Sequence, residues 1–198
     1  MLNINLHFPV HLPNVLLHVP RNVALAVGVP LVFGMLSGAP TSQEVKRHWY
    51  NSLHFPRGRP PPAAFPFIWS TLYMSIGYAS HLAAKTFDAS SSPEAKAALS
   101  KGLLVYFVQL GLNLGWTSLF FVKHKVGLAL VDSIMITGMS LYMTKLFHTP
   151  TSGKSTWFLA PYCAWLVYAT YLNAGIWHLN RNRYLREDDD EYSSKKDV

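Results

Sequence analysis

Five long apolar stretches occupy most of this 198-residue chain, and they restrict its fold more than any other feature. They cover residues 22–39, 63–84, 102–122, 126–147 and 156–179. A helix rises about 1.5 Å per residue, and about 20 residues cross a hydrocarbon core about 30 Å thick. Residues 102–122 carry no charge on any face, unlike the amphipathic helices of a soluble bundle. We therefore predict an all-α fold, an integral membrane bundle of five transmembrane helices.

The composition leaves room for one compact domain, because 50% of the residues are hydrophobic and only 14% are charged. We assign residues 22–180 to the transmembrane domain, residues 1–21 to an N-terminal extension, and residues 181–198 to a charged C-terminal tail. The only cysteine is Cys163, which excludes an intrachain disulfide and a cysteine metal cluster.

The basic residues lie in short loops and form no continuous stripe, so the net charge of +7 does not indicate nucleic acid as a partner. Most of them fall on the side that holds the loops after the first and third stretches and the C-terminal tail. These are Lys46, Arg47, Arg57, Arg59, Lys123, Lys125, Arg181, Arg183, Arg186, Lys195 and Lys196. By the positive-inside rule, the C-terminus is predicted to be cytosolic.

Aromatic and polar residues at helical spacing identify the inner faces of three stretches, because residues three or four positions apart share one face of a helix. The three sets are Trp69, Tyr73, Gly77 and Ser80, then Gln109, Asn113, Trp116 and Phe120, then Trp165, Ala169, Leu172 and Asn173. Lipid does not favour amide side chains, so these faces pack against other helices or line a cavity. We predict that Trp69, Trp116 and Trp165 surround one cavity.

Some of these residues have a structural interpretation as well. Gln109 could equally form only a hydrogen bond between helices, and Asp132 could bond to a loop instead of serving a ligand. The tryptophans nearest the ends of the stretches, Trp49, Trp157 and Trp177, are interpreted as interfacial anchors.

Two G-x-x-x-G motifs allow close approach of helices. Gly34 and Gly38 favour packing within the chain, whereas Gly111 and Gly115 fit packing within the chain and a homodimer interface equally well. The proline-rich loop 54–62 is a candidate lid.

Motifs for acid–base or metal chemistry do not occur. There is no G-x-S-x-G, no H-E-x-x-H and no phosphate loop. His81 and His178 form no i, i+4 pair, so neither a metal site nor a haem held by histidines is expected.

Residues in order along most of the chain resemble the translocator protein family, also called tryptophan-rich sensory proteins. The match includes Trp49-Tyr50, Pro60-Pro61, Trp69, Leu72-Tyr73, Gly77-Tyr78-Ala79-Ser80, Gln109-Leu110, Asn113, Trp116, Ala129-Leu130-Val131-Asp132, Pro161-Tyr162, Trp165 and Leu172-Asn173. It covers about residues 49–180, with the spacing of that family through four stretches.

The resemblance implies a five-helix membrane bundle with an inner pocket, open toward the loop after the first helix, that binds porphyrin or haem and sterols without an obligatory cofactor. It implies ligand-binding positions at Trp69, Tyr73, Asn113, Trp116, Leu128, Asp132, Trp165, Ala169, Leu172 and Asn173. We expect a location in the lipid bilayer, in the mitochondrial outer membrane of a eukaryote, with the endoplasmic reticulum or a bacterial membrane as alternatives. The homodimer is expected from the Gly111 and Gly115 motif.

This sequence departs from the family at several positions. Phe55 and Gly58 stand where the first loop of the family has Lys and Trp, and Leu128 replaces a pocket tryptophan. At the end of the last stretch, Ala174 and His178 replace the Tyr and Arg of the animal sterol motif. We therefore expect sterol to bind more weakly than porphyrin.

Three functions remain open. The first is a ligand-binding protein that transports, senses or turns over tetrapyrroles. The second is an enzyme that degrades porphyrin in light, for which the resemblance implicates Trp69 and Trp165. The third is a membrane scaffold without a ligand.

Overall fold

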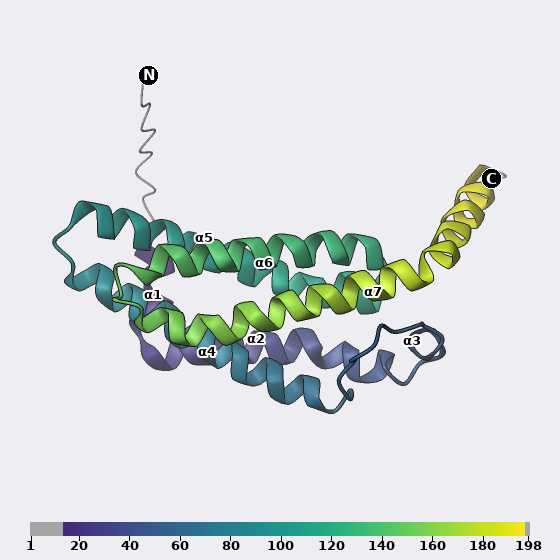
Figure 1. The fold of residues 1–198 in the computed structure, drawn as a ribbon, viewed down its shortest axis with the longest axis horizontal. Coiled ribbons are helices and arrows are strands. Elements are labelled where there is room, and N and C mark those ends of the chain that lie inside the picture. Colours follow the sequence, from purple (N-terminus) through teal and green to yellow (C-terminus); the bar gives the residue numbers. More distant parts are fainter. Residues whose placement is uncertain (1–13, 197–198) are drawn as a thin grey trace, which may run out of the picture.

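The computed structural model describes residues 14–196, and all the secondary structure in that part of the chain is helical (Figure 1). The elements are α1 (Asn14–Arg21), α2 (Val23–Glu44), α3 (His48–Asn51), α4 (Ala64–Ala89), α5 (Pro93–Thr117), the π-helical turn η1 (Ser118–Val122), α6 (Val126–His148) and α7 (Lys154–Lys196). The predicted all-α class is therefore confirmed for the described residues.

The five long helices of the described residues, α2, α4, α5, α6 and α7, lie alongside one another in a bundle (Figure 1). Helix α6 packs against α5 and α7, α2 packs against α4, and α4 also packs against α7. Within residues 14–196, three segments are long and apolar enough to cross a membrane, namely Val23–Thr41, Pro93–Val122 and Val126–His148. The protein is thus a membrane protein, and spanning by α4 and α7 stays a prediction.

Side chains at the start of two long helices satisfy backbone amides that would otherwise lack a partner. The Asn22 side-chain oxygen accepts hydrogen bonds from the amides of Ala24 at 2.9 Å and Leu25 at 3.2 Å. The Ser92 hydroxyl accepts from the Ala95 amide, and Pro93 occupies the first turn of α5, where no amide proton is needed. Both helices therefore begin where the sequence supplies a cap.

Part of the predicted N-terminal extension packs on the bundle. Leu17 of α1 is buried, and the Arg21 guanidinium pairs with both carboxylate oxygens of Asp88 at 2.8 and 3.0 Å. His81 Nδ1 lies 2.8 Å from the backbone oxygen of Pro20. Residues 14–21 therefore form an ordered helix against α4, and residues 1–13 lie outside the described residues.

The predicted boundary at residue 180 does not coincide with a helix end, because α7 continues through Lys196 and extends beyond the bundle (Figure 1). The same view places α3 and the end of α7 at one end of the bundle, and α1 at the other. The loop that contains α3 and the C-terminal segment are thus on one side, as the charge argument assumed.

A glycine allows a close contact between α2 and α4. A Cβ atom added at Gly77 would overlap the backbone oxygen of Ala26. A larger residue at this position would therefore push the two helices apart.

Candidate functional site: an aromatic cavity

A cavity of about 520 Å³ lies between the helices, within the range of about 300–1,000 Å³ typical of sites for small molecules. All five long helices contribute to it, together with α3, η1 and the loop between α3 and α4. The lining includes Gly34, Ser37 and Gly38 of α2, Trp69 and Tyr73 of α4, Asn113 and Trp116 of α5, Ser133 and Ile136 of α6, and Trp165, Ala169, Leu172 and Asn173 of α7. Most of the wall is apolar or aromatic.

Three tryptophans from three helices line this one cavity, as predicted from their spacing. The Trp69 and Trp165 rings meet edge to face, with centroids 6.4 Å apart and an interplanar angle of 89°. Trp116 stacks on Phe120 with centroids 4.9 Å apart. These rings present flat apolar surfaces to anything that enters.

The indole N–H groups of two of these tryptophans differ in their partners. Trp116 Nε1 donates to the Ala129 backbone oxygen at 3.1 Å and to Asn173 Oδ1 at 3.0 Å. Trp165 Nε1 is buried and has no hydrogen-bond partner among the described residues. A buried donor without a partner costs free energy, which a hydrogen bond to an acceptor would recover.

A chain of polar side chains crosses the bundle beside the cavity. The Tyr73 hydroxyl donates to Asn113 Oδ1 at 2.5 Å, and Asn113 Nδ2 donates to the Tyr162 hydroxyl at 3.3 Å. The Tyr162 hydroxyl in turn donates to Gln109 Oε1 at 2.7 Å. The oxygen and the nitrogen of the Asn113 amide thus both form hydrogen bonds to tyrosines of the protein. Gln109 is fully buried and does not line the cavity.

Two of the residues assigned to the ligand by resemblance lie outside the cavity lining. The Leu128 side chain is 59% exposed, on the outward face of α6 with Val131 and Ile134. Asp132 is buried, but it does not line the cavity, and one of its carboxylate oxygens has no hydrogen-bond partner among the described residues. The other eight assigned residues all line it.

The loop between α3 and α4, the candidate lid, is fastened to α7. His54 and Asn180 exchange two hydrogen bonds, from the His54 amide at 3.0 Å and from Asn180 Nδ2 at 2.9 Å. The Tyr168 and Tyr171 hydroxyls donate to the backbone oxygens of Gly58 and Arg57. Because Phe55, Pro56 and Arg59 of this loop line the cavity, α7 holds the wall in place.

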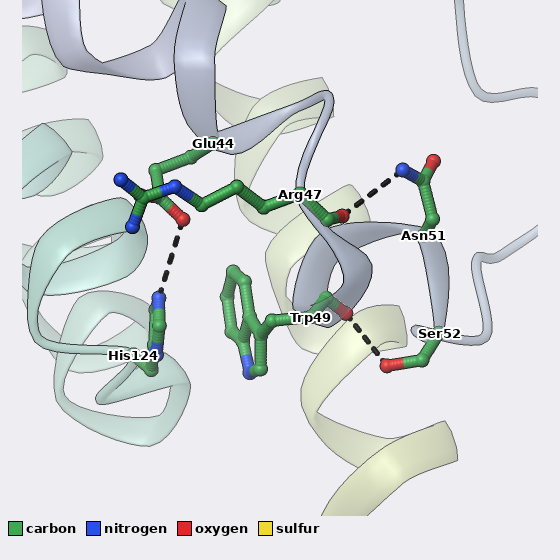
Figure 2. A network of polar contacts seen from close by, with 6 residues as sticks. All are labelled: Glu44, Arg47, Trp49, Asn51, Ser52 and His124. Atoms are coloured by element: carbon green, nitrogen blue, oxygen red, sulfur yellow. Dashed lines mark hydrogen bonds and ion pairs between the residues drawn. The ribbon is translucent and has the colours of Figure 1, made fainter.

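A polar network fixes the end of α2 relative to α3 and the turn before α6 (Figure 2). The buried Glu44 carboxylate pairs with Arg47 at 2.8 Å and lies 3.6 Å from His124 Nε2. The Trp49 ring stacks on the His124 ring, with centroids 3.9 Å apart (Figure 2). Trp49, interpreted from the sequence as an interfacial anchor, thus packs inside this network, and it positions the neighbouring cavity residue Tyr50.

The predicted interfacial anchors Trp157 and Trp177 are 82% and 40% exposed. Their exposure fits contact with the membrane interface, which stays a prediction.

The two glycine motifs have different surroundings. A Cβ atom at Gly34 would overlap the Tyr73 ring, whereas Gly38 borders the cavity. A Cβ atom at Gly111 or Gly115 would meet no heavy atom within 4 Å, and both residues are exposed on α5. Gly34 of the first motif therefore serves packing within the chain, and the second motif leaves an open helix face.

Some lining residues were missed from the sequence. They include Ser37 of α2 and the loop residues Phe55 and Arg59. The prolines of the loop indicated a lid. They did not indicate which loop side chains line the cavity, because the rule of helical spacing does not apply to a loop.

Comparison with known proteins identifies relatives of this sequence. The sequence model described as the TspO/MBR family matches residues 26–178. The chain is 36% identical to a translocator protein homolog of Schizosaccharomyces pombe, over 77% of this chain and 88% of that protein. It is 36% identical to the translocator protein of Bos taurus, over 80% of this chain and 91% of that protein. The tryptophan-rich protein TspO of Chlorobaculum tepidum is 30% identical, over 80% of this chain and 95% of that protein.

Proposed function

This chain belongs to the TspO/MBR family, and we propose that it binds a tetrapyrrole, a porphyrin or haem, in the aromatic cavity. The observation that carries the proposal is a cavity of about 520 Å³ lined by Trp69, Trp116 and Trp165. A flat conjugated ring gains stacking and edge-to-face contacts with such side chains, in addition to the burial of its apolar surface. The binding serves the transport, sensing or turnover of the ligand.

Sterol is the weaker ligand in this proposal. Leu172 and Ile176 line the cavity and offer apolar contact. Ala174 has no hydroxyl to meet a sterol hydroxyl, and His178 is exposed at the end of this segment. The polar end of a sterol therefore gains little from this part of α7.

The homodimer, the orientation and the membrane are parts of the same proposal. The exposed Gly111 and Gly115 support an interface on α5, since small residues let two helix backbones approach closely. The excess of basic residues on one side supports a cytosolic C-terminus. In a eukaryotic cell the proposed location is the mitochondrial outer membrane.

Titration of the purified protein with protoporphyrin in the dark tests the proposal. Tryptophan fluorescence should be quenched, because three tryptophans line the site. The quenching should saturate at one porphyrin per chain. Absence of saturable quenching would favour the ligand-free scaffold.

A second candidate function is light-dependent porphyrin degradation. The edge-to-face contact of Trp69 and Trp165 at the cavity favours it, because both rings would lie against a bound pigment. Illumination of the saturated complex distinguishes the two functions. If the porphyrin absorbance falls in the native protein but not in Trp69→Phe or Trp165→Phe, the enzyme is supported. If the spectrum of the native complex is unchanged by light, binding alone is supported.

A further inference from the structure

The loop between α3 and α4 forms one end of the cavity, here called the loop end. Arg59 is held there by its contacts with two aromatic rings. Its guanidinium carbon lies 3.7 Å from the centroid of the Phe55 ring and 5.0 Å from that of Tyr50. Arg59 Nη2 donates to the Tyr50 hydroxyl at 3.1 Å. All three residues line the cavity. The two rings hold the planar cation in one orientation before any ligand arrives.

The charge of Arg59 has no counter-ion in the described part of the protein. None of the described carboxylates forms an ion pair with it, and its Nε atom is buried without a hydrogen-bond partner. The phenol of Tyr50 supplies no negative charge, because burial raises its pKa and outweighs the lowering effect of Arg59. Neither Asp nor Glu occurs among the residues that line the cavity, and Lys46 adds a second cation there. The loop end is therefore positive, whereas most of the rest of the wall is apolar or aromatic and none of it is charged.

We propose that Arg59 binds a carboxylate of the ligand, so that the cavity selects an amphipathic anion with a flat apolar body and an acidic end. The inference rests on the proposed function, since it uses the same cavity and deepens its ligand class. A guanidinium presents several N–H donors in one plane and matches the two oxygens of a carboxylate. The body of the ligand lies among the tryptophans, and the acid meets Arg59 and Lys46.

Two ligands of the same shape test this assignment: protoporphyrin IX, which has two carboxylic acids, and its neutral dimethyl ester. We expect Arg59→Gln to weaken binding of the diacid about five- to tenfold, because a hydrogen bond to a charged group is about twice as strong as a neutral one. Binding of the ester should change less than about twofold, since it offers no charge to the arginine. Arg59→Lys should retain part of the preference for the diacid.

Arg57→Gln is the matched control. Arg57 lies two residues away in the same loop, is exposed, and contributes its backbone oxygen but no cavity contact. Its replacement should leave the affinities for both ligands unchanged. Raising the salt concentration should weaken binding of the diacid but not of the ester, and the effect on the diacid should be larger in the chain that retains Arg59 than in Arg59→Gln.

The outcomes separate the two proposals. Equal losses for diacid and ester in Arg59→Gln would mean that the arginine only packs the loop, which overturns this inference and leaves the proposed function standing. Unchanged affinity for both ligands would overturn it as well. If the native protein binds neither compound, the proposed function fails, and this inference fails with it.

Discussion

At the scale of a single residue, Trp165 lines the cavity and has a buried indole N–H without a partner among the described residues. Trp165→Phe retains an aromatic ring and removes the donor. We expect porphyrin affinity to fall about two- to tenfold, the range of about 0.5–1.5 kcal/mol for one hydrogen bond. Fluorescence-independent titration, by porphyrin absorbance in the dark, measures the change.

Trp157→Phe is the control for this substitution, because Trp157 is 82% exposed and does not line the cavity. Equal affinities of the Trp165 variant and the native protein would show that the free N–H does not contact the ligand.

Asn113 lines the cavity, but its hydrogen bonds give it a structural role. Both ends of its amide bond to tyrosines, so Asn113→Ala leaves the hydroxyls of Tyr73 and Tyr162 with fewer partners. We expect a loss of about 1–3 kcal/mol in stability, seen as a lower unfolding temperature in detergent. A variant with unchanged unfolding temperature and lost porphyrin binding would instead make Asn113 a direct ligand contact.

In the proposed function, the affinity for sterol depends on two side chains of α7, Ala174 and His178. Introducing Ala174→Tyr and His178→Arg together supplies a hydroxyl and a permanent cation. We expect sterol affinity, measured by equilibrium binding of labelled cholesterol, to increase while porphyrin affinity stays the same. Tight sterol binding by the unmodified protein, with no effect of the double substitution, would place sterol recognition elsewhere.

At the scale of a helix, α5 has one face in the bundle and one face open. Gly111 and Gly115 lie on the open face, where larger side chains meet no atom of the same chain. Replacing both with Leu should shift a dimer toward monomer and spare porphyrin binding. Cross-linking in membranes measures the shift. Gly138→Leu, at an exposed position on α6 with equal space around it, is the matched control.

Helical periodicity was sufficient to predict the inner faces of α4, α5 and α7. It succeeded because residues three or four positions apart share a face whatever the neighbouring helix is. The same rule did not assign α6. Leu128 was assigned through family resemblance, but α6 turns Ser133 and Ile136 toward the cavity. Mostly apolar helices show little contrast between faces, so their inner side is not readable from one sequence.

Contacts between distant segments were also beyond prediction from the sequence. The loop after α3 is fastened to α7 by residues more than 100 positions away, as in the bond of 3.0 Å between His54 and Asn180. Its cation, Arg59, was counted from the sequence only as a topology signal. Its place in the cavity depends on the aromatic contacts with Phe55 and Tyr50, which form only when α3 and the loop fold together.

At the scale of the whole molecule, the cavity exists because five helices leave space between their small and aromatic side chains. No single helix encloses it, and the loop and η1 complete its wall. A ligand that fills the cavity would contact residues of all five long helices, and its binding would stabilise the bundle as a whole by linkage.

The most direct test fills the cavity from one position. Ala169 lines the cavity, so Ala169→Trp occupies part of the space that a porphyrin needs. Val167→Trp places the same side chain on the same helix at a position that is 54% exposed and does not line the cavity. Dark titration with protoporphyrin should show saturable binding by the native chain and by the Val167 variant, and at least about a tenfold loss in the Ala169 variant. Equal affinity of all three proteins would contradict the claim that this cavity is the ligand site.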